Sequence, residues 1–281
     1  MSVSKVTGVV PLSPPRKRRL GLLTIGRAPT RGQFLGISVT VFALLIAAWW
    51  AATSSGAIPA LFLPGLDRVW HRMVALTADG TLAGDIKSSL YRIVIAFVIS
   101  SAMSIVIGAL AGCYGLFKAI VEPLVDFVRY MPVVAFVPLT ILWTGTDDFQ
   151  KFLVIWIGTF FQQVLMMIDA VKRVPSDFVG LGRTLGMPDR AIMLKIVLPA
   201  AMPAIWDALR ISLGWAWTWL VLAELVASTS GLGYRIVVSQ RYFQTDTIIG
   251  YILLLGFLGL ITDQVMRAAE RILFRYNRRR G

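Results

Sequence analysis

The sequence predicts an all-α, polytopic membrane protein with about six transmembrane helices. Of its 281 residues 57% are hydrophobic, and the mean hydropathy is +0.72. Soluble domains contain about 45–50% apolar residues. The apolar residues also gather into runs long enough to cross a hydrocarbon core about 30 Å thick. The runs that we expect to span are residues 35–52, 91–112, 124–143, 152–168, 204–227 and 247–266.

A basic, proline-containing segment precedes the first span. Residues 1–33 show no sustained apolar periodicity, which predicts a largely disordered tail. A signal peptide is the alternative, but the run that follows is long enough to span and further spans come after it. We therefore expect a transmembrane domain over 34–270, followed by a second basic tail over 271–281.

The segment after the first span is expected to leave the hydrocarbon. Pro59 and Pro64 break helical periodicity, and the charged residues that follow indicate a short amphipathic helix outside the membrane. His71, in this segment, and Cys113 are the sole histidine and cysteine of the chain. These two residues supply neither an intramolecular disulfide nor a His/Cys metal cluster.

The second and third spans contain charged residues and prolines, and each of these residues has its own expected role. Arg92, at the outer end of the second span, is expected to snorkel to the interface. Asp126 and Arg129 share one face of the third span, which favours an ion pair over a role in substrate binding. Pro132 and Pro138 interrupt the hydrogen bonds of that helix, so freed carbonyls need neighbours or a water-lined cavity. The third span is therefore a candidate wall of a pathway.

The fourth and fifth spans add polar and aromatic candidates. Gln162 and Gln163, near the middle of the fourth span, either bond across helices or face a wet cavity. Trp215 and Trp219 share one face of the fifth span, away from the interfacial depth where tryptophan usually lies. Tight helix packing and a cavity wall are both open for this pair.

A carboxylate and a glycine-containing turn lie farther out. Glu224 needs a partner because an isolated carboxylate in a membrane is costly, and we expect Arg235 or Arg241 to pair with it in a gate or structural role. The turn that follows contains Ser228, Gly231 and Gly233. A flexible gate and a simple tight reversal both fit this turn.

Residues 175–203 form a long polar interruption between the fourth and fifth spans. Ser176 is expected to cap a first short helix, Gly186 to end it, and Pro188 to begin a second. The first helix carries an apolar stripe made by Phe178, Leu181 and Leu185. The pattern predicts a helix–turn–helix, which either lies on the bilayer or docks to a cytoplasmic partner.

The distribution of positive charge fixes the expected orientation. With six spans, three quarters of the 28 Lys and Arg residues fall on the side of the two tails and the central stretch. Cytoplasmic loops carry an excess of Lys and Arg, so this side is expected to be cytoplasmic. The same bias accounts for the net charge of +13, and we therefore expect no nucleic-acid partner.

The central stretch resembles a known motif. Gly186, Ile196, Leu198 and Pro199 form the spacing G-x9-I-x-L-P, which is similar to the EAA motif in membrane subunits of ABC-type importers. In that family a Glu-Ala-Ala triplet precedes the glycine by six residues, whereas this chain has Gly-Leu-Gly from Gly180. Residues 35–270 resemble the nitrate, sulfonate, taurine and bicarbonate branch through FLPGLDRVW, SLYRIVIAF, RYMPVVAFVPL, RTLG, LPAAMPAI, AELVASTSGLGYRI and FQTDTII.

The resemblance implies a permease of type I importer architecture in a bacterial inner membrane. Two permeases would surround one pathway within membrane lipid, a binding protein would deliver a small anion, and ATP with Mg would act in partner ATPase subunits. The chain has no G-x4-G-K-[ST] phosphate loop, so we expect it to be non-catalytic and without a cofactor. The implied coupling-helix residues are Asp177, Arg183, Thr184, Leu185, Gly186, Met187, Pro188 and Arg190. The candidate pathway or gate residues are Arg129, Pro132, Gln162, Gln163, Trp215, Trp219, Glu224, Ser228, Gly231 and Gly233.

The sequence leaves two alternatives open. The mid-membrane tryptophans would equally suit a planar heterocycle as cargo of the same importer class. A self-sufficient secondary transporter or channel would need ion ligands near the midplane. The acids of the spans fall mostly near span ends, and two of them have basic partners at helical spacing, which argues against a proton relay.

Overall fold

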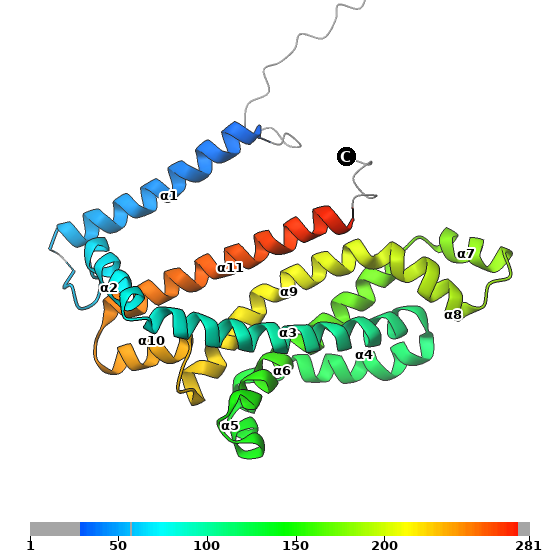
Figure 1. Cartoon of the computed structure of the whole chain (residues 1–281). Coiled ribbons are helices and arrows are strands. Elements are labelled where there is room, and N and C mark those ends of the chain that lie inside the picture. Colours follow the sequence, from blue (N-terminus) through cyan, green and yellow to red (C-terminus); the bar gives the residue numbers. More distant parts are fainter. Residues whose placement is uncertain (1–28, 57, 275–281) are drawn as a thin grey trace, which may run out of the picture. The chain divides into compact units, whose positions relative to one another are not determined.

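The computed structural model describes residues 29–56 and 58–274, and every regular element within them is a helix (Figure 1). The predicted all-α fold is therefore confirmed. The helices are α1 (Arg31–Ser54), α2 (Leu66–Ala78), α3 (Thr81–Cys113), α4 (Gly115–Arg129), α5 (Val133–Thr144), α6 (Asp148–Lys172), α7 (Ser176–Thr184), α8 (Asp189–Ile192), a π-helical turn (Met193–Val197), α9 (Leu198–Ala227), α10 (Leu232–Arg241) and α11 (Thr245–Leu273).

Within the described residues, five helices are long and apolar enough to cross a membrane. They are α1, α3, α6, the continuous helix that ends as α9, and α11. The bent pair α4 and α5 makes a sixth crossing if it counts as one span. Most helices extend past the apolar runs of the sequence, because helix ends at the interface carry polar residues. The second span, for example, begins at Thr81 instead of residue 91.

The chain divides into two units, Met1–Ser55 and Gly56–Gly281. In the first unit the structure describes α1, whose first turn is closed by a capping box between Thr30 and Gln33. The tail predicted over 1–33 thus ends earlier, since α1 begins at Arg31, and residues 1–28 lie outside the described residues. At the other end, α11 continues to Leu273, past the expected boundary at residue 271.

The centre of the second unit is a bundle in which α6 packs against both α3 and α9. Small residues permit the close approach of α3 and α6. A Cβ atom at Gly108 would lie 2.3 Å from Met167 Cβ, and one at Gly112 would lie 2.7 Å from Val171 Cγ1. Backbone contact of this kind replaces hydrophobic burial as the main attraction between helices in a membrane.

The third span is broken rather than continuous, which corrects the expectation of a single helix over 124–143. Helices α4 and α5 meet at an angle of 96°. Pro132 caps the start of α5, where its missing N–H costs no helical hydrogen bond. The expected ion pair between Asp126 and Arg129 is present at 3.0 Å.

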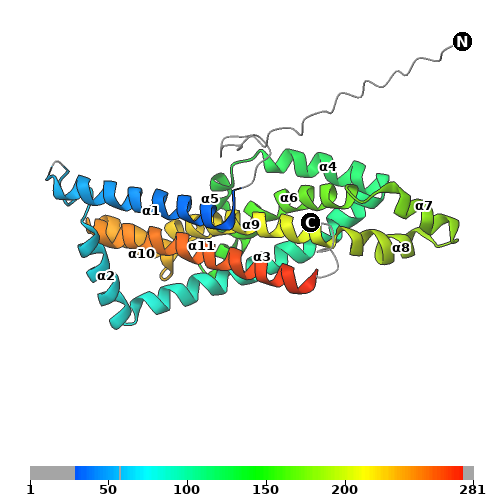
Figure 2. The ribbon, with the colours of Figure 1, turned by 90° about the horizontal axis from the view of Figure 1, so that it is seen from above.

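Two short helices lie at one end of this bundle. The amphipathic helix predicted after the first span is α2, which buries Val69 and Leu76 and exposes His71. Helix α10 was not predicted; its residues fall in the outer segment between the fifth and sixth spans. Figures 1 and 2 place α2 and α10 at the end of the bundle opposite to α7 and α8.

The central stretch forms the predicted helix–turn–helix. Gly186 ends the turn after α7 with φ of 70°, a left-handed conformation that favours glycine. The predicted cap at Ser176 is wrong by one residue, because Pro175 occupies the cap position and Ser176 begins the helix. Pro188 likewise caps α8 instead of lying within its first turn, and α8 then runs on without a break into α9.

Candidate functional site

A cavity of about 380 Å³ opens at the corner where α4 and α5 meet. The α4–α5 corner, α6 and α9 supply its walls, and Arg129 is the one charged side chain among the described lining residues. Its lining residues are Val128, Arg129, Tyr130, Met131, Pro132, Val133, Ile157, Gly158, Phe161, Gln162, Trp215 and Trp219. The broken span thus brings together five of the ten residues proposed for a pathway or gate, namely Arg129, Pro132, Gln162, Trp215 and Trp219, and leaves out those of the outer turn, Gln163 and Glu224.

Arg129 is held at the cavity by local contacts. Its guanidinium lies 4.7 Å from the centre of the Tyr130 ring and donates a 3.0 Å hydrogen bond to the Tyr130 hydroxyl. Asp126 supplies the counter-charge from the preceding turn. Since Arg129 is exposed, the ion pair is worth little on its own, and the guanidinium is available to a ligand.

The two tryptophans of the fifth span that share a face both line this cavity. A Cβ at Gly158 would lie 2.4 Å from Trp219 Cγ, so the glycine of α6 allows the indole to lie against the helix backbone. Trp215 is 38% exposed. Trp217 instead packs in the core and donates to Thr262 Oγ1 at 3.1 Å. Trp219 thus both packs against α6 and lines the cavity, and Trp215 lines the cavity, so packing and a cavity wall hold together for this pair.

Of the two adjacent glutamines, one bonds across helices and the other faces a cavity. Gln163 is fully buried and bonds across helices to four serines. Its Oε1 accepts from Ser100 at 2.6 Å and Ser104 at 3.3 Å, and its Nε2 donates to Ser101 at 3.3 Å and Ser212 at 3.0 Å. Gln162 lines the cavity.

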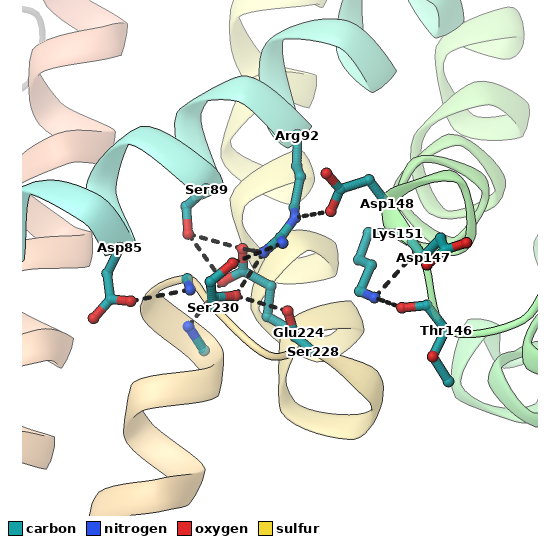
Figure 3. A network of polar contacts seen from close by, with 12 residues as sticks. Asp85, Ser89, Arg92, Thr146, Asp147, Asp148, Lys151, Glu224, Ser228 and Ser230 are labelled. Carbon is teal, nitrogen blue, oxygen red and sulfur yellow. Dashed lines mark hydrogen bonds and ion pairs between the residues drawn. The ribbon is translucent and has the colours of Figure 1, made fainter. Parts of the chain in front are cut away.

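A second cluster, which we call the Arg92 network, lies at the α10 end of the bundle (Figure 3). Arg92 donates to Asp148 Oδ1 and to Glu224 Oε1, each at 2.7 Å, and to the carbonyl of Ser230 at 2.7 Å. The side chain of Arg92 is only 5% exposed. The expectation that Arg92 snorkels to the interface is wrong, because the fully buried Glu224, the half-buried Asp148 and the carbonyl of Ser230 hold the guanidinium within the bundle.

Glu224 is paired, but with partners other than those expected. Its carboxylate accepts from Arg92, from Ser89 at 2.8 and 2.9 Å, and from the backbone N–H of Gly233 at 2.9 Å. Arg235 instead forms an ion pair of 2.9 Å with Asp85. Burial opposes the charge of Arg235, but hydrogen bonding to Asp85 outweighs it and raises the pKa of the guanidinium.

The turn between α9 and α10 is a tight reversal fixed by this network. Gly231 donates to Asp85 Oδ1 at 3.1 Å, and its φ of 112° is a conformation that favours glycine. A Cβ at Gly231 would lie 2.3 Å from Glu224 Oε1, so the absence of a side chain is also a steric requirement. Ser228 closes the turn by donating to the carbonyl of Ser230 at 2.7 Å. A role as a gate stays a prediction.

The sequence reasoning missed the part that α3 plays in this network. Asp85, Ser89 and Arg92 are spaced as i, i+4 and i+7, which places them on one face of a helix. The expected second span began at residue 91, so only Arg92 of the three was considered. A helix extended back to the glycine at position 80 would have shown the polar stripe.

Helix α7 exposes its apolar stripe. Phe178 and Leu181 of α7 are 46% and 58% exposed, and Leu185, which directly follows the helix, is 69% exposed. Met187 is half-buried and packs against the core. The other implied coupling residues are exposed, namely Asp177, Arg183, Thr184, Gly186, Pro188 and Arg190. An unburied apolar stripe on a short helix is typical of a protein-binding surface.

A helical bundle with a broken span, a cavity at the break and an exposed loop of two short helices is an architecture suited to a membrane transport subunit. Comparisons with known proteins assign the family. Residues 104–275 match the family described as binding-protein-dependent transport system inner membrane component, and the chain belongs to this family. It is an inner membrane permease component of an ABC transporter.

Individual relatives agree with this assignment. A probable ABC transporter permease of Brucella abortus is 37% identical over 87% of this chain and 97% of its own length. A putative aliphatic sulfonates transport permease of Bacillus subtilis is 32% identical over 83% of this chain and 85% of its own length. The MetNI methionine ABC transporter, solved in inward-facing conformations, has a similar fold with a TM-score of 0.60 at 18% identity, covering 68% of this chain and 94% of the solved one.

Replacing Glu224 with Gln should destabilise the protein strongly, because Arg92 would lose a buried counter-charge. Breaking a buried pair by changing one partner typically costs about 3–5 kcal/mol. The matched control is Glu122→Gln, which removes an exposed pair with Lys118 worth less than about 1 kcal/mol. Thermal unfolding in detergent measures both. Equal shifts for the two variants would contradict the assignment of Arg92 and Glu224 as a buried pair that supports the fold.

Proposed function

We propose that this chain is the transmembrane subunit of an ATP-driven importer, and that two copies enclose one pathway for a small anion. A binding protein delivers the anion to the outer face, and separate ATPase subunits with ATP and Mg act on the cytoplasmic face. Both termini and the α7–α8 loop lie in the cytoplasm, as the distribution of Lys and Arg favours. Family membership and the sulfonate permease among the relatives support this function.

The cavity at the α4–α5 corner is the observation that indicates which class of cargo this chain transports. Its charged lining residue is a cation, and an amide and two indoles complete the polar and aromatic walls. A guanidinium recognises the paired oxygens of a sulfonate, nitrate or bicarbonate group. The indoles of Trp215 and Trp219 favour a second candidate cargo, a planar heterocycle, because aromatic faces stack on flat rings.

The exposed apolar stripe of α7 supports the coupling role. A helix that inserts its apolar face into a groove of an ATPase transmits the movement of that ATPase to the bundle. The stripe consists of Phe178, Leu181 and Leu185, next to the basic residue Arg190. Because α8 runs on into α9, a displacement of the loop reaches the helix that carries Trp215 and Trp219.

Substitution of Leu185 by Glu should abolish co-purification with the partner ATPase of this permease. A charged group in the centre of an apolar contact costs about 2 kcal/mol or more, which lowers affinity at least tenfold. Leu116→Glu is the matched control, since Leu116 is 73% exposed and lies in the first turn of α4. Retained binding by Leu185→Glu, with membrane insertion intact, would argue against docking through this stripe.

The variant Arg129→Gln should raise the KM for sulfonate uptake about tenfold, because a charge-assisted hydrogen bond contributes about 1.5–3 kcal/mol. Asp126→Asn should lower the KM, since it removes the acid that competes with cargo for Arg129. Arg241→Gln, a change at an exposed arginine of α10, is the control. Uptake kinetics in proteoliposomes with the complete importer measure all three. An unchanged KM in Arg129→Gln would favour the uncharged heterocycle instead.

A further inference from the structure

The face of α7 opposite to the apolar stripe lines a second cavity, of about 480 Å³. The cavity lies between α7, the C-terminal ends of α3 and α6, and the start of α8. The residues that α7 contributes are Ser176, Val179, Gly180 and Arg183. Their spacing of i, i+3, i+4 and i+7 is a single stripe of an α-helix. The apolar stripe of Phe178, Leu181 and Leu185 lies about 180° away around the helix axis.

The orientation of the apolar and polar stripes of α7 is the reverse of the usual one. A helix on a protein surface turns its apolar stripe inward and its polar stripe to solvent. In α7 the large apolar side chains are exposed, whereas a stripe with a hydroxyl and a guanidinium turns toward the cavity in the bundle. Ser176, Arg183 and Lys172 are exposed to solvent as well as lining the cavity, so their polar groups are hydrated when it is empty and can exchange that water for a polar occupant.

The charges around the cavity favour an anion. Lys172 and Arg183 line it from two different helices, and Asp189 is the one acid among the described lining residues. Glu122 approaches Lys172 from α4, but its Oε1 lies 3.9 Å from the Lys172 ammonium. Within residues 58–274, Arg183 forms no ion pair with an acidic side chain. The guanidinium is therefore available to a ligand.

Gly180 keeps the wall of the cavity open. A Cβ at this position would meet no atom within 4 Å, so the backbone borders free space rather than a packed neighbour. Its φ lies outside the left-handed region, so the local conformation does not require glycine. The free space remains available to the occupant of the cavity.

We propose that this cavity binds a small oxyanion group, such as sulfate, a sulfonate or a phosphate, through Arg183 and Lys172. Arg183 offers paired N–H donors to two oxygens, and Lys172 supplies a point charge from the other wall. The cytoplasmic location of the site rests on the proposed function. An occupant here lies between α7 and the bundle, and so biases the position of the helix whose other face docks to the ATPase. The oxyanion comes either from the cytosol or from a phospholipid headgroup.

The single cysteine of the chain provides a direct test, since Cys113 lines this cavity and is half-buried. The rate of maleimide labelling of Cys113 is measured on the purified full-length chain in detergent, with sodium sulfate or with sodium chloride at equal ionic strength. Sulfate at about ten times its Kd should slow labelling roughly tenfold, because the reagent needs the unoccupied cavity. The melting temperature should rise with sulfate over the same range, which gives a second readout.

Variants separate this site from general salt effects. Lys172→Met should abolish both effects of sulfate, whereas Lys195→Met, the same change at an exposed lysine outside the cavity, should retain them. Asp189→Asn should strengthen protection, because it removes the acid that repels the ligand. Equal sulfate protection in Lys172→Met and the unsubstituted chain would overturn the proposal.

Lipid arms identify the source of the oxyanion. Labelling is repeated without sulfate in nanodiscs of phosphatidylglycerol or of phosphatidylcholine. If labelling is slower in phosphatidylglycerol and Lys172→Met restores the rate, the occupant is a lipid headgroup. If sulfate alone protects Cys113, the occupant is a free anion. If neither sulfate nor phosphatidylglycerol changes labelling or melting, the proposal is wrong. These measurements need no ATPase and no transport, so their failure is distinct from failure of the proposed importer function.

Discussion

The buried ion pair between Arg92 and Glu224 is the constraint on which one end of the bundle depends. Hydrocarbon cannot solvate either group, so each must find its hydrogen bonds within the protein. Those bonds come from α3, α6, α9, the turn before α10 and the first turn of α10, and they join these elements at 2.7–2.9 Å. The glycines of the turn follow from the same requirement, because a side chain at Gly231 would occupy the position of the Glu224 carboxylate.

A rigid end of this kind allows movement elsewhere. The Arg92 network and the α7–α8 loop lie at opposite ends of the bundle (Figures 1 and 2). Between them the third span breaks at Pro132, and the cavity with Arg129 opens at that break. In this account the network holds α3 and α9 together while α7 and the broken span respond to the ATPase. Asp148, which is 45% exposed at the start of α6, is the network member with the greatest freedom to change partner.

Local signals in the sequence predicted much of the fold, and tertiary contacts account for what they missed. Apolar runs located the spanning helices, and the positive φ of Gly186 was expected from its place after an amphipathic run. The Asp126–Arg129 pair was also foreseen, because residues three apart on a helix are neighbours. By contrast, Arg92 and Glu224 are 132 residues apart, and no local pattern joins them. Helix α10 was missed because its first turn follows a glycine and serine cluster that is typical of loops.

The central claim is that this permease moves cargo only when an ATPase acts on the α7–α8 loop. The most direct measurement is uptake of a radiolabelled sulfonate into proteoliposomes that contain the permease with its binding protein, with and without its partner ATPase. The account predicts uptake that requires both the ATPase and hydrolysable ATP, and none with the permease alone or with an imposed proton gradient. Uptake by the permease alone would contradict the account and would favour a secondary transporter or channel.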